Sequence, residues 1–241
     1  MIKTEICVNS DNFISQSVSS AYIGGADTIE LCSQMHLSGL TPEKKEITKA
    51  RKAFEGRSGL MVMIRNRAGN FNYTKIEISE MCNQIRLAAE CKANGVVFGA
   101  LSENNNVDID SLKRCVDISK SLDLLVTFHR AFDATPNPLE TLEILIEYGV
   151  DRILTSGTKW NENKSAVDGV DILNKIINSA ENKIEVVIGG GIAQNNVVKI
   201  LEKLLNKSNK ISFHAYSSVL VNGAANLALV KAFVETVKNY K

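Results

Sequence analysis

Gly25-Ala26-Asp27-Thr28-Ile29 is the stretch of this sequence that most directly indicates the fold. A glycine of the kind that ends helices is followed within three residues by residues typical of a β-strand. Gly149-Val150-Asp151-Arg152-Ile153 repeats this arrangement, and Gly95-Val96-Val97 is a shorter version of it. Three copies of the same helix-to-strand junction indicate one βα unit that is used repeatedly along the chain.

Short apolar runs alternate with longer segments of helical spacing between and beyond these junctions. Runs this short that are apolar on both faces are typical of buried parallel strands. We count eight, at residues 4–8, 28–31, 60–64, 96–98, 124–128, 152–154, 185–188 and 211–214. Thr41-Pro42 and Asn137-Pro138 predict two helix starts, because each places a capping residue before a proline at the first helical position.

Eight βα units predict a (β/α)8 TIM barrel, and we expect one such domain to span residues 1–241. The alternative is an open, doubly wound sheet. Eight strands would be many for an open sheet in a chain of this length, so the pattern favours the barrel.

Composition and charge exclude several classes of protein. The chain has 28 Lys and Arg against 27 Asp and Glu, for a net charge of +1, and 44% of its residues are hydrophobic. This composition argues against a disordered chain, a nucleic-acid binder and a polybasic membrane-surface protein. No apolar run approaches the roughly 18–20 residues of a membrane span.

The five cysteines and the N-terminal segment bear on location. The odd number of cysteines and the charged residues near the N-terminus indicate free thiols and no export signal. We therefore expect a cytoplasmic protein. The oligomeric state stays open, and a homo-oligomer is compatible with the sequence.

Polar residues gather where the predicted strands end, which is the functional face of a barrel. Burying such groups unpaired would cost several kcal/mol each, so we expect them to pair or to bind a ligand. The alternative interpretation is a salt-bridge network that closes the barrel mouth. The candidate site residues are Glu5, Cys7, Glu30, Cys32, Arg65, Arg67, His129, Asp133, Ser156, Gly190, Gly191 and His214.

Cys7 and Cys32 are predicted to end adjacent strands with their side chains on one face. Neighbouring strands lie about 4.8 Å apart, so two thiolates at this spacing could share one soft metal ion. Sulfur ligands favour Cu(I) or zinc over magnesium or calcium. The alternative is that both cysteines are small hydrophobic residues of the core.

Other residues at this face suit a small anion. Arginine binds carboxylate or phosphate through paired hydrogen bonds, and Arg65 and Arg67 share one face. His129 or Glu30 would transfer a proton, and Asp133 is a further catalytic candidate. Gly190 and Gly191 either bind a phosphate through backbone N–H groups or form a tight turn.

These motifs make the chain resemble the CutC family, which is associated by name with copper homeostasis. The resemblance implies a cytoplasmic (β/α)8 barrel and a Cu(I)-binding role, in which Cys7 and Cys32 match family cysteines. The matching stretches are 5–8, 24–32, 39–42, 63–65, 95–99, 126–133, 152–157, 189–191 and 213–215.

The chain departs from the family pattern in two places. The family usually has Arg-Pro-Arg followed by Gly-Gly-Asp after the third strand, whereas this chain has Arg65-Asn66-Arg67-Ala68-Gly69-Asn70. Ile188 replaces the family proline before the glycine triplet. The first change alters the rigidity and charge expected of that loop.

Two functional hypotheses follow. In the first, the protein handles copper, and Cys7 and Cys32 bind Cu(I) together with a third ligand such as His129 or a bound small molecule. In the second, the protein is an enzyme that acts on a small anionic metabolite, either a phosphate or a carboxylate. A scaffold role would explain neither the thiols nor the arginines.

Overall fold

Eight parallel strands close into a barrel in chain order, β1 to β8, and β8 pairs with β1. The computed structural model describes residues 2–207 and 210–240. The barrel strands are β1 (Lys3–Asn9), β2 (Thr28–Cys32), β3 (Leu60–Met63), β4 (Gly95–Phe98), β5 (Leu125–Phe128), β6 (Arg152–Thr155), β7 (Glu185–Ile188) and β8 (Ile211–Ala215). The predicted (β/α)8 barrel is confirmed, and each strand boundary lies within one residue of its prediction.

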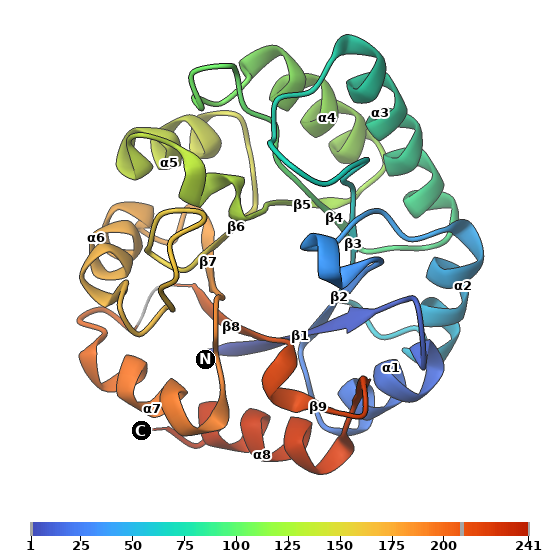
Figure 1. Cartoon of the computed structure of the whole chain (residues 1–241), viewed down its shortest axis with the longest axis vertical. Coiled ribbons are helices and arrows are strands. Elements are labelled where there is room, and N and C mark those ends of the chain that lie inside the picture. Colours follow the sequence, from blue (N-terminus) through green and yellow to red (C-terminus); the bar gives the residue numbers. More distant parts are fainter. Residues whose placement is uncertain (1, 208–209, 241) are drawn as a thin grey trace.

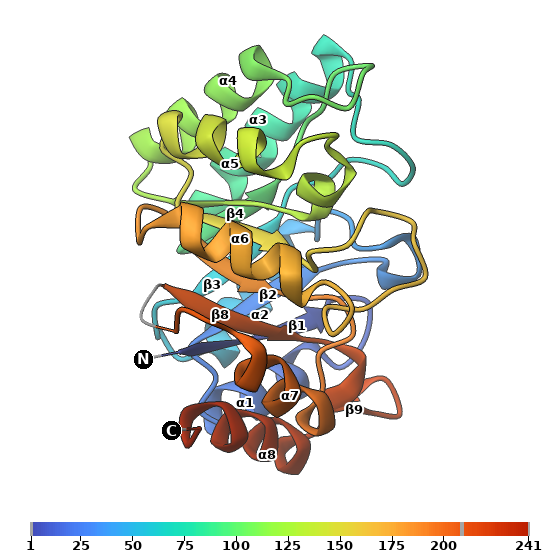
Figure 2. The ribbon, with the colours of Figure 1, turned by 90° about the vertical axis from the view of Figure 1, so that its left-hand side faces the viewer.

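A ring of helices surrounds the barrel (Figure 1). The helices are α1 (Ile14–Ile23), α2 (Lys44–Ala53), α3 (Lys75–Glu90), α4 (Ile109–Ser121), α5 (Pro138–Glu147), α6 (Val170–Ala180), α7 (Gln194–Lys203) and α8 (Leu227–Lys238). Short elements follow strands 2, 5 and 8: η1 (Met35–Leu37), η2 (Arg130–Ala134), η3 (Ser217–Val219), β9 (Leu220–Val221) and β10 (Ala224–Ala225). Figure 2 shows both chain termini on the side of the molecule opposite the β9 loop. None of the helices in the described parts of the chain is long and apolar enough to cross a membrane.

Of the two predicted helix starts, one is confirmed and the other is wrong. Helix α5 begins at Pro138, and the Asn137 side chain caps it. Helix α2 begins only at Lys44, after Glu43, and not at Thr41-Pro42. The Thr41 hydroxyl is used elsewhere: it accepts a hydrogen bond from the Arg65 backbone N–H at 2.8 Å.

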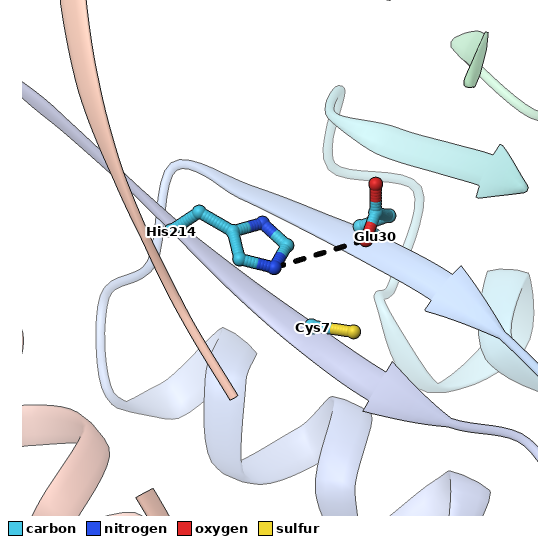
Figure 3. Close-up of side chains that lie close together, drawn as sticks. All are labelled: Cys7, Glu30 and His214. Atoms are coloured by element: carbon cyan, nitrogen blue, oxygen red, sulfur yellow. Dashed lines mark ion pairs between the residues drawn. The ribbon is translucent and has the colours of Figure 1, made fainter. Parts of the chain in front are cut away.

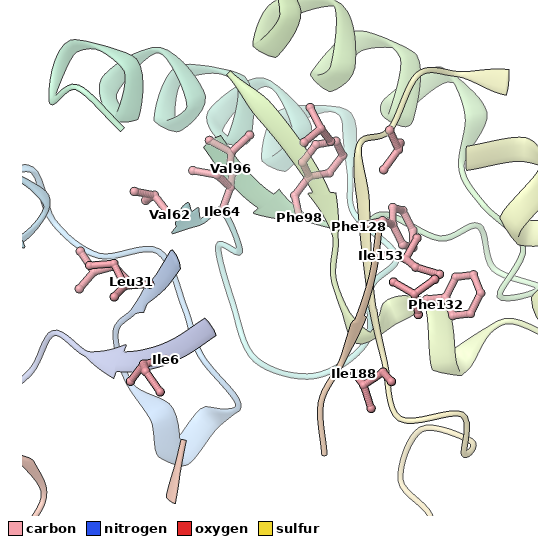
Figure 4. Close-up of a cluster of buried hydrophobic side chains, with 14 of the residues drawn as sticks. Ile6, Leu31, Val62, Ile64, Val96, Phe98, Phe128, Phe132, Ile153 and Ile188 are labelled. Carbon is pink, nitrogen blue, oxygen red and sulfur yellow. The ribbon is translucent and has the colours of Figure 1, made fainter. Parts of the chain in front are cut away.

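The strand side chains that point outward form the main apolar core between barrel and helices (Figure 4). Because side chains alternate along a strand, the other set points into the barrel. The inward set is unusually polar, and Glu5, Arg152 and Glu185 form one charged layer there. Arg152 Nη2 lies 2.7 Å from Glu5 Oε2, and Arg152 Nε lies 3.3 Å from Glu185 Oε1. The salt-bridge network considered from the sequence therefore exists, but it fills the barrel interior below the mouth.

Candidate functional site at the barrel mouth

A cavity of about 260 Å³ opens at the carboxyl ends of the strands, above this charged layer. Small-molecule sites usually measure about 300–1,000 Å³, so the cavity suits a small ligand or an ion. Six of the predicted site side chains line it together: Cys7, Glu30, Cys32, Arg65, His129 and His214. Gly190 and Gly191 also line it, as do Arg130 and Trp160.

One wall of the cavity is rich in sulfur. Cys7, Cys32, Met61 and Met63 form a small buried cluster that is separate from the main core, and Met35 packs against it. The Cys7 Sγ and Met35 Sδ atoms are 3.9 Å apart. Met35 was missed from the sequence, because it lies on the short η1 helix after β2 and no spacing rule links it to the cysteines.

The two thiols interact with each other, so they ionise as a pair. Their hydrogen bond is the largest influence on both pKa values. It lowers the pKa of Cys7. Together with burial, it raises the pKa of Cys32 well above its ordinary value. Cys32 also lies 3.5 Å from the carboxylate oxygen Oε2 of Glu30. Cys7 is therefore the thiol that loses its proton more readily.

Cys7, Glu30 and His214 form a compact group contributed by β1, β2 and β8 (Figure 3). One ligand atom from each lies within 4.8 Å of the other two. Burial acts to lower the pKa of His214, but the charge of Glu30 and hydrogen bonds to Cys7 and Glu5 raise it well above its ordinary value. Burial raises the pKa of Glu30, although His214 opposes this shift.

Such a group fits a metal ion in size and chemistry. Two ligands with bonds of about 2.3 Å to one ion are at most about 4.6 Å apart, so the three atoms, which lie within 4.8 Å of one another, would need to close by at most about 0.2 Å. The histidine that lies beside Cys7 is His214, whereas His129, which the sequence suggested as a third ligand alongside a bound small molecule, lies next to Phe71. Binding of a metal would displace the thiol proton and the proton that His214 holds.

Glu5 lies one layer below the cavity and does not line it. Its carboxylate accepts a hydrogen bond from Arg152 and lies 3.0 Å from His214 Nδ1. Burial acts to raise the pKa of Glu5, but Arg152 and His214 outweigh it and lower the pKa well below the ordinary value. Glu5 therefore acts as a charged support that orients His214.

Arg65 and His129 stand on the wall formed by β3 and β5. Both residues lie next to the Phe71 ring. The centroid of that ring is 5.0 Å from the centroid of the His129 ring and 5.4 Å from the guanidinium carbon of Arg65. Burial, followed by the Arg65 charge, lowers the pKa of His129 to about 3. His129 is therefore a neutral imidazole at physiological pH.

Three further predicted residues do not line the cavity: Asp133 and Ser156 belong to a hydrogen-bond network beside it, and Arg67 points away from it. Asp133 holds Arg130 at 2.7 Å and accepts hydrogen bonds from the backbone and the hydroxyl of Ser156, each at 3.1 Å. Arg130 in turn lines the cavity beside Gly190. Arg67 points away, because its Nε atom donates to Glu77, so it does not share an anion clamp with Arg65.

A second cysteine pair was also missed. Cys82 and Cys115 lie on helices α3 and α4, are fully buried, and form a hydrogen bond that lowers the pKa of Cys82 to about 6. No sequence rule pairs two cysteines on neighbouring helices. This pair lies outside the cavity.

Comparison with known proteins decides the family. The model of the CutC family matches residues 2–213. The chain belongs to the CutC family. A CutC family protein from Parabacteroides distasonis is 40% identical over 81% of this chain and 76% of its own length.

Named relatives and solved structures extend this assignment. A human protein named "Copper homeostasis protein cutC homolog" is 39% identical over 82% of this CutC-family chain and 68% of its own length. A solved structure of CutC from Streptococcus agalactiae has a TM-score of 0.78 and 26% identity, and the match covers 89% of this chain and 98% of the other. N-(5'-phosphoribosyl)anthranilate isomerase from Pyrococcus furiosus, with a TM-score of 0.60 and 17% identity, shares the fold alone.

Proposed function

We propose that this CutC-family chain binds Cu(I) at the barrel mouth, in the cytoplasm, through the thiolates of Cys7 and Cys32. The observation that carries the proposal is the gathering of sulfur donors on one cavity wall, with Cys7 Sγ 3.9 Å from Met35 Sδ. Thiolates and thioethers are the donors that select Cu(I), and Met35 would be the third ligand. The copper homeostasis name of the human relative agrees with this role.

The lowered pKa of Cys7 supports the proposal, because the thiolate is the form that binds metal. His214 and Glu30 would then serve the site as neighbours of Cys7. Glu30 would accept the thiol proton that Cu(I) displaces, and the protonated His214 would stabilise the Cys7 thiolate.

An anaerobic Cu(I) titration against a competing chelator tests the proposal. We expect the wild type to bind one Cu(I) and a Cys7→Ala, Cys32→Ala double variant to lose most of that affinity. The matched control is a Cys82→Ala, Cys115→Ala double variant, which removes the other buried thiol pair and keeps the site. Unchanged Cu(I) affinity in the Cys7, Cys32 variant would show that the proposed site is wrong.

A second candidate function is catalysis on a small anionic metabolite. The observation that favours it is that Arg65 and His129 face the same cavity as the Cys7–Glu30–His214 group. In this scheme Arg65 would bind the anion and Glu30 would transfer a proton. A thermal-shift screen of sugar phosphates and carboxylic acids at pH 6–8 tests it, because a ligand that binds the native state raises the Tm. A screen without any stabilising compound would count against it.

A further inference from the structure

Three buried polar atoms on the cavity wall have no hydrogen-bond partner among the described residues. They are Arg65 Nε, His129 Nε2 and Glu30 Oε1. The side chains that carry them are 3%, 4% and 3% exposed, and all three line the cavity. A buried polar group left without a partner costs about 1–3 kcal/mol, so three facing one cavity indicate a site built for a ligand.

Arg65 is a buried cation whose charge no carboxylate neutralises within the described chain. Its Nη1 atom donates to the carbonyl oxygens of Leu37 and Gly39, at 2.8 and 3.1 Å, and its Nη2 atom donates to Gly69. These bonds fix the guanidinium in place, and its Nε atom has no hydrogen-bond partner among the described residues. The position therefore offers one fixed donor and one unneutralised positive charge to the cavity.

His129 offers a second donor of known polarity. Its Nδ1 atom accepts a hydrogen bond from the Ala131 backbone N–H at 3.1 Å, so the proton of the neutral ring is on Nε2. The Phe71 ring packs against the imidazole. The Nε2 atom has no hydrogen-bond partner among the described residues, so its N–H is open to an oxygen ligand.

Glu30 Oε1 is a hydrogen-bond acceptor, so it requires a donor from the ligand. Its partner oxygen, Oε2, lies 3.5 Å from Cys32 Sγ and 3.8 Å from His214 Nε2, whereas Oε1 has no donor. A ligand that satisfies all three atoms must present oxygens to Arg65 and His129 and a donor, such as a hydroxyl group, to Glu30.

We propose that the cavity binds a small hydroxy carboxylic acid, whose carboxylate accepts hydrogen bonds from Arg65 Nε and His129 Nε2 and whose hydroxyl donates to Glu30 Oε1. Two single N–H donors match the two oxygens of one carboxylate, and the Arg65 charge neutralises it. The cavity volume of about 260 Å³ suits a molecule of this size. The inference rests on the second candidate function, for which it supplies the ligand class, and it does not require copper.

Isothermal titration of the metal-free protein with lactate, glycerate, malate and tartrate tests the inference. We expect at least one of these acids to bind with a Kd below about 1 mM and its counterpart without a hydroxyl group, such as propionate or succinate, to bind several-fold more weakly. His129→Leu should weaken binding at least tenfold, because it removes a donor to a charged group. His129→Gln, which keeps an N–H donor at a similar distance from the backbone, should restore most of the affinity.

Two controls separate this inference from the copper proposal. Arg67→Gln changes a neighbouring arginine outside the cavity and should leave acid binding unchanged. The Cys7→Ala, Cys32→Ala variant should lose Cu(I) and still bind the acid. Failure of all four acids to bind would overturn the inference without affecting the copper site, as would unchanged affinity in His129→Leu or binding of inorganic phosphate in preference to the acids.

Discussion

The neutral state of His129 leads to a quantitative prediction about stability and pH. Burial and Arg65 lower the pKa of this imidazole to about 3 in the folded protein, and its ordinary value is 6.5. A group whose pKa is lower in the folded state contributes stability above its unfolded pKa, and that stability is lost as pH falls towards the folded pKa. His129 should therefore favour folding fully at pH 8 and progressively less below about pH 6.5.

The size of the effect at pH 5 depends almost entirely on the unfolded chain. There the unfolded histidine is about 97% protonated, whereas a folded group with a pKa near 3 stays neutral. The difference corresponds to about 2 kcal/mol of unfolding free energy between pH 8 and pH 5. The value changes little for any folded pKa below about 4.

Urea unfolding of the wild type and of His129→Gln at both pH values measures this difference. Both proteins share His36, His214 and all carboxylates, so subtraction leaves the contribution of His129. The wild type should lose about 2 kcal/mol more than the variant between pH 8 and pH 5. A difference below about 0.5 kcal/mol would mean that the folded protein accepts a proton at His129, and the neutral state argued for this ring would be wrong.

Two further changes test the support of the site. Glu5→Gln should lower the unfolding free energy measured in urea by about 3–5 kcal/mol, because the buried Arg152 would keep only Glu185 as a carboxylate partner within the barrel. A loss below about 1 kcal/mol would contradict the charged layer. Gly99→Ala should lower the unfolding free energy by about 1–3 kcal/mol and displace the His129 ring, because the added Cβ would lie 2.6 Å from His129 Nδ1. An unchanged Tm together with an unchanged NMR signal of the His129 ring would refute that close packing.

The apolar pattern along the chain was sufficient to predict the barrel and most of the residues that line its cavity. Buried parallel strands read as short apolar runs whichever helices cover them, so the eight strands were predicted within one residue. The strand prediction also indicated that the polar residues at the strand ends lie together, because a barrel places those ends at one face. Cys7, Glu30, Cys32, Arg65, His129 and His214 do line one cavity there.

The partners of these residues, and therefore their separate roles, became visible only in the folded protein. The alternation of side chains put Glu5, Arg152, Cys7 and His214 on the inward face, but only the closed barrel shows that Cys7 and His214 line the cavity, whereas Glu5 pairs with Arg152 away from it. Contacts between distant segments turned Arg67 towards Glu77, brought Met35 to Cys7, and left Arg65 without a carboxylate. Packing between distant segments determines such partners, and the spacing of residues along the chain does not predict them.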